Sequence, residues 1–367
     1  KDIEAVVDVL RSDFLTQGSV VPKFEHKLCE YTGAENAIAV NSCTSALHIA
    51  CLALNLGPGD ILWTSPISFV ASANCGLYCG ASVDFVDIDP NTALLSIKKL
   101  EEKLQYAKKK GKLPKIVIPV HFGGQPCDMK EIYALSKKYN FKIIEDAAHA
   151  IGAKYQDKLI GSCQYSDITV FSFHPVKIIT TGEGGVAMTN NLQLSDRMRL
   201  LRSHGITRDV SKMKNKPDGA WYYEQIDLGF NYRMTDIQAA LGISQLNRIE
   251  QYVSRRNEIA EWYNKKFRTT DISPLMQKMG RSSAYHLYVI LIKGGRQQRD
   301  VLYNYLLKND IGVNLHYIPV YKHPFFNKNS CLENAEYYYK HAISLPIYPT
   351  ISSKDLNKVV DKILCYI

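Results

Sequence analysis

Long apolar segments are absent from this sequence of 367 residues, as are internal repeats and low-complexity segments. No uninterrupted apolar run approaches the roughly 18 residues that a membrane-spanning helix needs. The first residues, KDIEAVVDVLRSDF, predict an amphipathic helix rather than a signal peptide, because acidic residues interrupt the apolar ones. We therefore expect no membrane segment. The chain starts without methionine, and we expect a native N-terminal segment upstream of it.

Zinc-binding spacings are also missing. The nine cysteines are dispersed, and the closest pair, Cys75 and Cys79, has no second cysteine or histidine pair at the spacing of a zinc site. The odd number and the scattered positions predict reduced thiols in a cytoplasmic protein without a bound metal.

Nucleotide-binding fingerprints are a third absence. The glycine-rich stretch TTGEGG, residues 180–185, has the glycine spacing of neither a Walker phosphate loop nor a dinucleotide-binding turn. This argues against a nucleotide hydrolase and against a nicotinamide-dependent dehydrogenase.

Positive charge is present in excess, with a formal net charge of +9 at pH 7. Its densest source is KKLEEKLQYAKKKGKLPK, residues 98–115. We interpret this segment as the solvated face of an amphipathic helix and the turn after it, a common arrangement of charges, rather than as a nucleic-acid site. A mild positive field also suits a phosphorylated small-molecule substrate.

Short β-rich runs alternate with helical stretches between residues 36 and 190. Apolar strands separated by helices of crossover length predict a mostly parallel sheet with helices on both faces. Beyond residue 236 a long helical stretch leads into a mixed tail. We therefore expect an α/β fold with a large domain over residues 1–240 and a smaller α+β domain over residues 241–367.

Ligands of such sheets gather at the carboxyl ends of the strands, and four of these ends carry notable residues. Thr44 and Ser45, in NSCTSAL, offer hydroxyl and N–H groups for an anion, or alternatively a simple helix N-cap. Phe69, in PISFVASAN, can line the same crevice, although by itself it fits core packing better.

The other two strand ends carry ionisable groups. Glu145 and Asp146 end an apolar strand in IIEDAAHA, with His149 three residues later. A metal site is a weak alternative there, because no third ligand lies nearby. Lys177, in FSFHPVKIITTGEGG, is either a strand-end lysine in water or a reactive amine in a pocket.

One ligand satisfies all four strand ends. It needs a phosphate for the helix N-terminus, a basic ring nitrogen for Asp146, a flat ring for Phe69 and an aldehyde for Lys177. Pyridoxal 5′-phosphate has these groups, and its enzymes use a Schiff-base lysine and an acidic partner of the pyridinium nitrogen.

Five motifs, in order, resemble those of the DegT/DnrJ/EryC1/StrS sugar aminotransferases: NSCTSAL, EDAAHA, FSFHPVK with TTGEGG, RSHG and LGFNYRMTDIQAALG. The resemblance covers nearly the whole chain and implies the fold-type I architecture of pyridoxal-phosphate-dependent aminotransferases. It also implies a homodimer whose active sites are shared between subunits. The cofactor-binding residues that it implies are Lys177 as the catalytic Schiff-base lysine, Asp146 on the pyridinium nitrogen, His149 beside the ring, Phe69 stacked on it, Thr44, Ser45 and Ser172 on the phosphate, and Asn231 on the phosphate of a neighbouring subunit.

Within the family, TSPISFVASAN, HPVK and GVNLHYIPVY resemble members of the pseudaminic acid pathway. These members transfer an amino group from L-glutamate to C4 of a UDP-linked 4-keto-6-deoxy-N-acetyl sugar. The stretches DFLTQG and LHYI match segments that contact substrate, and Cys43 lies in the cofactor loop, where the family has a small residue. The substrate-binding residues implied are Asp13, Phe14, Leu15, Thr16, Cys43, Leu315, His316, Tyr317 and Ile318.

Three alternatives remain. The first is a related aminotransferase that acts on another nucleotide-linked 3- or 4-keto sugar. The second is a sugar dehydratase, a branch of the fold that has histidine at the lysine position; here Lys177 occupies that position, and His174 lies three residues before it. The third is a cofactor-binding regulator, which would need an appended DNA-binding or partner domain.

Overall fold

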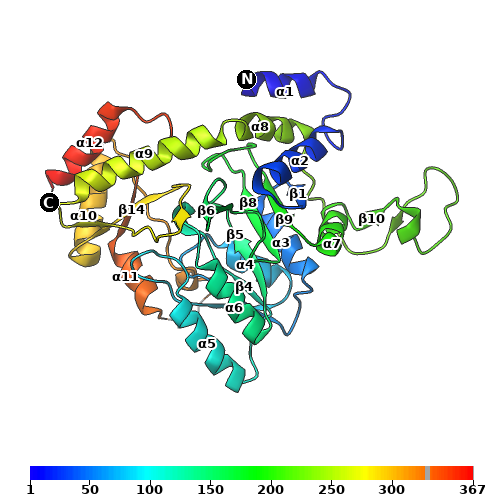
Figure 1. Cartoon of the computed structure of the whole chain (residues 1–367), viewed down its shortest axis with the longest axis horizontal. Coiled ribbons are helices and arrows are strands. Elements are labelled where there is room, and N and C mark those ends of the chain that lie inside the picture. Colours follow the sequence, from blue (N-terminus) through cyan, green and yellow to red (C-terminus); the bar gives the residue numbers. More distant parts are fainter. Residues whose placement is uncertain (327–330, 367) are drawn as a thin grey trace.

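The computed structural model describes residues 1–326 and 331–366. A sheet of seven strands lies at its centre (Figure 1). The strand order is β1-β9-β8-β5-β4-β2-β3, and only β9 runs antiparallel to its neighbours. This confirms the predicted mostly parallel sheet. Its strands are β1 (Asn36–Val40), β2 (Ile61–Thr64), β3 (Ser82–Phe85), β4 (Ile116–Ile118), β5 (Lys142–Asp146), β8 (Ile168–Ser172) and β9 (Gly185–Thr189).

Helices cover both faces of this sheet. The right-handed crossovers from β1 to β2 and from β2 to β3 place α3 and α4 on one face, whereas those from β3 to β4 and from β4 to β5 place α5 and α6 on the other. The central strands β4 and β8 are buried along their whole length, as a doubly covered sheet requires. The helices of this part are α1 (Asp2–Leu10), α2 (Val20–Thr32), α3 (Cys43–Ala53), α4 (Ala71–Tyr78), α5 (Ile97–Lys109), α6 (Met129–Tyr139), α7 (Leu192–Arg202) and the 3₁₀ turn η1 (Phe122–Gly124).

The lysine-rich segment forms α5 as predicted. Its buried residues are Leu100, Leu104 and Ala107, and the remaining side chains lie on the solvated face or at its border.

The C-terminal part has its own hydrophobic cluster, built from residues between Ile259 and Ile363. Its antiparallel sheet has the order β12-β14-β15 and packs with α9, α10 and α11, and α12 packs on α10. The predicted boundary between residues 240 and 241 falls inside α8, and the division into two domains stays a prediction. The elements are α8 (Asp236–Leu246), α9 (Ile249–Phe267), β12 (Ile272–Pro274), β14 (Tyr288–Ile292), α10 (Gly295–Lys308), η3 (Val320–Lys322), α11 (Glu333–His341), β15 (Ala342–Leu345) and α12 (Ser353–Leu364).

The long helical stretch expected beyond residue 236 is two helices. α8 ends at Leu246, and Arg248, with φ −120° and ψ 7°, leaves the helical region before α9 begins. Hydrophobic periodicity continues through the break, which is why the sequence pattern does not reveal it.

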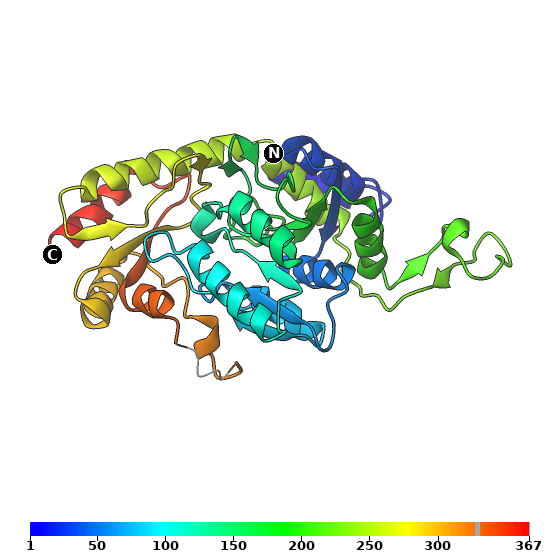
Figure 2. The ribbon, with the colours of Figure 1, turned by 60° about the horizontal axis from the view of Figure 1, so that its bottom comes forward.

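Two short antiparallel sheets complete the fold. One pairs β13 (Arg281–Ser282) with β6 (Lys154–Tyr155) and β7 (Lys158–Leu159). The other, β10 (Ile206–Thr207) with β11 (Glu224–Gln225), begins an arm with the 3₁₀ turn η2 (Val210–Lys212) that projects from the body on the right in Figure 2. In the described ranges, no helix has the length and apolar character needed to cross a membrane.

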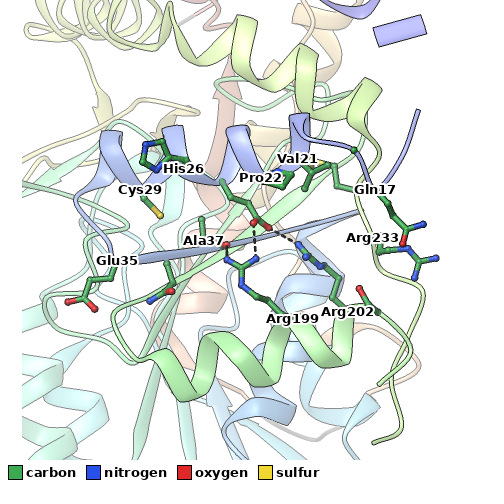
Figure 3. Close-up of a pocket in the computed structure, with 15 residues that line it drawn as sticks. Gln17, Val21, Pro22, His26, Cys29, Glu35, Ala37, Arg199, Arg202 and Arg233 are labelled. Carbon is green, nitrogen blue, oxygen red and sulfur yellow. Dashed lines mark hydrogen bonds and ion pairs between the residues drawn. The ribbon is translucent and has the colours of Figure 1, made fainter. Parts of the chain in front are cut away.

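The free edge of the large sheet, β1, is covered by charged side chains (Figure 3). Glu25 of α2 accepts a hydrogen bond from the Ala39 backbone N–H at 2.8 Å and pairs with Arg199 and Arg202 of α7. The two arginines donate to the carbonyl groups of Ala37 and Ala39, each at 2.8 Å. Three outward backbone groups of β1, the carbonyls of Ala37 and Ala39 and the Ala39 N–H, are therefore satisfied, which opposes pairing of this edge with another strand.

Candidate active site

The carboxyl ends of the parallel strands open into a cavity of about 900 Å³. β5 ends in it with Asp146 and β8 with Ser172, and the loops after β1 and β2 supply further walls. The cavity brings together most of the predicted residues: Cys43, Thr44, Ser45, Phe69, Asp146, His149, Ser172, Lys177, Leu315, His316 and Tyr317.

The N-terminus of α3 forms one wall of this cavity. Ser42 is the N-cap, and its side chain accepts a hydrogen bond from the Ser45 N–H at 3.1 Å. The alternative interpretation of Thr44 and Ser45 as N-caps is therefore wrong, because both lie within the first turn. The first N–H groups of a helix have no partner within it and carry partial positive charge, so this wall suits an anion.

Lys177 lies in the loop between β8 and β9, and its side chain reaches into the cavity. Burial lowers the pKa of its amine, while the nearby groups of Cys43 and Asp146 raise it and only partly compensate. Among the described residues, no hydrogen bond or ion pair holds its Nζ atom. The interpretation as a strand-end lysine in water is wrong, and the amine is easier to deprotonate than an ordinary lysine.

Asp146 faces the cavity from the end of β5, buried and held by two hydrogen bonds. Its Oδ2 accepts from the Ser72 hydroxyl at 2.5 Å, and its Oδ1 accepts from the Ala148 N–H at 3.1 Å. The carboxylate is therefore fixed in orientation.

Glu145 precedes Asp146 in the strand and points to the opposite face, because side chains alternate along a strand. It accepts hydrogen bonds from His121 Nε2 at 2.7 Å and from Thr169 Oγ1 at 3.0 Å. Burial raises the pKa of Glu145, but these hydrogen bonds outweigh burial and lower it overall. Of the two predicted carboxylates, only Asp146 belongs to the cavity.

His149 is buried between three loops. The Gly123 N–H donates to its Nδ1 at 3.3 Å, and its Nε2 lies 3.2 Å from the Tyr317 hydroxyl oxygen. Burial, assisted by Lys177 and His316, lowers its pKa well below the ordinary value, so the imidazole is neutral.

Phe69 is not a core residue, contrary to the simpler interpretation. Its side chain is 60% exposed in the chain and lines the cavity, 6.4 Å from the Tyr317 ring between centroids. The aromatic ring is thus accessible to a ligand in the cavity.

Several predicted residues do not line this cavity. Asn231 is exposed, and its carbonyl accepts a hydrogen bond from the side chain of Asn41, a cavity residue, at 3.4 Å. The stretch from Asp13 to Thr16 is exposed and joins the body through a bridge between Thr16 and Thr235. Ile318, 40% exposed, follows the cavity residues Leu315, His316 and Tyr317. Their roles stay predictions.

Ser72 and Gln238 are two polar residues of the cavity that the sequence patterns did not single out. Ser72 is the hydrogen-bond donor to Asp146. Gln238 belongs to a capping box with Thr235 at the start of α8, and its Nε2 donates to the Glu183 carbonyl at 2.7 Å. The spacing TDIQ signals the capping box, but not its position beside the cavity.

The described residues contain no cluster of histidine, cysteine and acidic side chains that could hold a metal ion. All nine cysteines lie among them and are free thiols.

Comparison with known proteins identifies the family. The family model of the DegT/DnrJ/EryC1/StrS aminotransferases matches residues 1–364. The chain belongs to this family. The prediction of a pyridoxal-phosphate-dependent sugar aminotransferase with the fold of these enzymes is thereby confirmed.

Relatives match along almost their full length. The UDP-4-amino-4,6-dideoxy-N-acetyl-beta-L-altrosamine transaminase of Campylobacter jejuni is 40% identical over 98% of this chain and 93% of its own. The spore coat polysaccharide biosynthesis protein SpsC of Bacillus subtilis is 38% identical over 99% of this chain and 93% of its own.

Solved structures agree with this assignment. PseC of Helicobacter pylori, an aminotransferase involved in the biosynthesis of pseudoaminic acid, superposes with a TM-score of 0.89 at 31% identity, covering 100% of this chain and 95% of its own. The putative sugar aminotransferase Spr1654 of Streptococcus pneumoniae, in its PLP-form, superposes with a TM-score of 0.89 at 28% identity. This match covers 100% of this chain and 95% of the Spr1654 chain.

The residues of this aminotransferase fit pyridoxal 5′-phosphate. Lys177 offers a partly desolvated amine for the aldehyde, and Asp146 offers an oriented carboxylate for the ring nitrogen. The α3 N-terminus suits the phosphate, and Phe69 presents an accessible aromatic ring.

Proposed function

We propose that this aminotransferase moves the amino group of L-glutamate to C4 of a UDP-linked 4-keto-6-deoxy-N-acetyl sugar, as in pseudaminic acid biosynthesis. The observation that carries the proposal is the 40% identity, over nearly the whole chain, to the altrosamine transaminase of Campylobacter jejuni. The likeness to Helicobacter pylori PseC supports the same pathway.

The residues of the cavity have distinct tasks in this proposal. When bound, pyridoxal phosphate supplies an electron sink for the substrate carbon that loses a proton. Asp146, anchored by Ser72, keeps the ring nitrogen protonated, because a carboxylate favours the charged form of its partner. Lys177, with its lowered pKa, accepts a proton from that carbon and returns it on the other side of the transfer.

We also propose that two subunits of this chain share each active site. Asn231 is exposed next to Asn41 at the cavity wall and is free to reach a neighbouring molecule. A homodimer of this kind, in the cytoplasm, completes the proposal.

An absorbance experiment tests the proposal. The protein loaded with pyridoxal phosphate is expected to lose the absorbance of the lysine-bound cofactor when L-glutamate is added, and to regain it with a UDP-linked 4-keto-6-deoxy-N-acetyl sugar. The amino sugar formed is identified by mass spectrometry and NMR. Lys177→Ala should keep the fold and lose both changes, whereas Lys138→Ala, at an exposed lysine, should keep them. Reaction of the Lys177→Ala protein, or no recovery with the keto sugar, would contradict the proposal.

A second substrate has specific support. The identity of 38% to SpsC nearly equals that to the altrosamine transaminase, so another nucleotide-linked 3- or 4-keto sugar is the alternative acceptor. In the same assay, faster recovery with such a sugar would favour this alternative.

A further inference from the structure

The hydrogen bonds of His149 define its tautomer. A backbone N–H donates to Nδ1, from Gly123 at 3.3 Å, so Nδ1 carries no proton. Because the pKa of His149 is far below its ordinary value, the ring is neutral and its proton lies on Nε2. Nε2–H therefore donates to the Tyr317 oxygen at 3.2 Å.

In this arrangement the Tyr317 hydroxyl accepts a hydrogen bond from His149, and its own proton is not donated to any group among the described residues. Tyr317 lines the cavity, and burial and the nearby Asp146 raise the pKa of the phenol, so the proton stays on. It is available to an acceptor atom of a ligand in the cavity.

His286 lies behind His149, outside the cavity lining. The two rings are 4.3 Å apart between centroids at an angle of 40°, and His286 is 7% exposed. Its Nδ1 is buried without a hydrogen-bond partner among the described residues. A buried polar atom without a partner is costly, and this cost is borne by a ring that lies directly against His149.

Arg256 of α9 holds the backbone at His286. Its Nη1 lies 3.0 Å from the carbonyl oxygen of Tyr285, 3.3 Å from that of His286 and 2.9 Å from that of Ile347. Arg256 is buried, and in the described part of the chain no carboxylate pairs with it. Burying an arginine that donates only to carbonyl groups costs free energy, because no carboxylate balances its charge.

The same loop is attached to the one that binds His149 Nδ1. The Leu287 N–H donates to the Gly123 carbonyl at 3.2 Å. Gly124 has φ +100°, and an added Cβ would lie 2.8 Å from Tyr285 N and 3.0 Å from the His149 carbonyl oxygen. The backbones of three chain segments thus meet at Gly124, with no room there for a side chain.

We propose that Arg256 and His286 are positioning residues of this aminotransferase: they hold the His149 ring so that the Tyr317 hydroxyl donates its proton to an oxygen atom of the cofactor or of the amino donor. The proposal rests on the aminotransferase site described above and does not depend on the identity of the sugar. His286 acts through His149 and Tyr317, and neither His286 nor Arg256 touches the ligand.

A double-mutant cycle tests this chain of contacts in the intact protein. The variants are His286→Ala, Tyr317→Phe and the double variant, with Asn257→Ala as matched control. Asn257 is next to Arg256 in α9 and donates to the Ser283 carbonyl at 2.9 Å, in the same loop as His286. The Kd for pyridoxal phosphate, the rate of the L-glutamate step and the thermal midpoint are measured for each.

We expect His286→Ala and Tyr317→Phe each to raise the Kd or lower the rate by about tenfold, which is the effect of one hydrogen bond. The Kd or rate of the double variant should change by no more than that of either single variant. A change in Kd identifies the cofactor as acceptor, and a change in the rate alone identifies the amino donor. Asn257→Ala should lower only the thermal midpoint.

Additive losses, or a Tyr317→Phe variant with unchanged Kd and rate, would overturn the proposal. If His286→Ala does not fold, Arg256→Lys replaces His286→Ala in the cycle. His286→Phe, which keeps a flat ring against His149, should then retain the wild-type Kd and rate. Neither readout needs a sugar, so failure of the UDP-sugar assay contradicts the proposed substrate and leaves this test intact.

Discussion

The Ser72 hydroxyl donates a hydrogen bond to the Asp146 carboxylate, with 2.5 Å between Oγ and Oδ2. Ser72 lies in the first turn of α4, and its oxygen is also 2.7 Å from the Ser68 hydroxyl oxygen. The start of α4 therefore sets the direction of the carboxylate at the end of β5. A serine on a neighbouring helix thereby becomes part of the proposed cofactor site.

Replacing Ser72 should loosen this carboxylate. Hydrogen bonds to charged groups contribute about 1.5–3 kcal/mol, so Ser72→Ala should raise the Kd for pyridoxal phosphate by about tenfold or more. Equilibrium titration of the cofactor-free protein measures the Kd. Ser195→Ala is a matched control, because the Ser195 hydroxyl in α7 is buried without a partner in the described part of the chain and lies outside the cavity lining. An equal Kd for both variants would contradict a role of Ser72 in orienting Asp146.

The strand ends were predictable from the sequence because apolar runs mark them directly. Asp146 and Lys177 follow such runs, and both reach the cavity. The sequence pattern did not show which of Asp146 and Glu145 faces the cavity, because the face on which a side chain lies depends on the register of the strand. Ser72 was not predictable, since its role arises from the packing of α4 beside β5. Asn231 is exposed in the single chain, and its proposed role depends on a neighbouring subunit, which strand patterns within one chain do not reveal.

Acid should destabilise the protein through His316. Burial, assisted by Lys177, lowers its pKa to about 4, whereas the unfolded value is about 6.5. Between these values the unfolded chain binds a proton that the folded chain does not, so stability falls as the pH drops from about 6.5 to 4. At pH 4 this effect should lower the free energy of unfolding of the wild type by on the order of 2–3 kcal/mol, and His316→Asn should remove this loss.

Urea unfolding of the cofactor-free protein at pH 7, 5.5 and 4.5 measures this effect. The variant should show a flatter dependence on pH than the wild type, with a remaining slope from the buried His149 and His286. His26→Asn, at an exposed histidine of α2, should reproduce the wild-type slope. Parallel pH curves for His316→Asn and the wild type would contradict the prediction.

Asn231 provides a test of the shared site. Asn231→Ala should weaken cofactor retention if the side chain binds the phosphate of a neighbouring subunit. Mixing it with Lys177→Ala should form heterodimers in which one of two sites has both residues. Random exchange then restores about a quarter of the wild-type activity, because half of the dimers are mixed and half of their sites are intact. Activity that stays at the level of the separate variants after subunit exchange would indicate a self-contained site.

The charged cover of β1 should be a major source of stability. Glu25 is 6% exposed, pairs with Arg199 and Arg202 and accepts a hydrogen bond from the Ala39 N–H. Removing one partner of a buried ion pair costs about 3–5 kcal/mol, because the remaining charge has no counterion. The Arg199 side chain is 38% exposed, so water compensates in part, and Glu25→Gln should lower the free energy of unfolding by about 3 kcal/mol.

Urea unfolding at neutral pH measures this loss. The control is Glu30→Gln in the same helix, whose pair with His26 is exposed and should contribute less than about 1 kcal/mol. Glu25 lines a separate cavity of about 530 Å³, which contains none of the predicted site residues. Folded Glu25→Gln protein should therefore keep the wild-type rate of the L-glutamate step. Similar small losses for the two variants would show that the arginines hold the edge of β1 without Glu25. A lower rate in the folded variant would instead show that the edge strand positions the α3 N-terminus, which follows β1 directly.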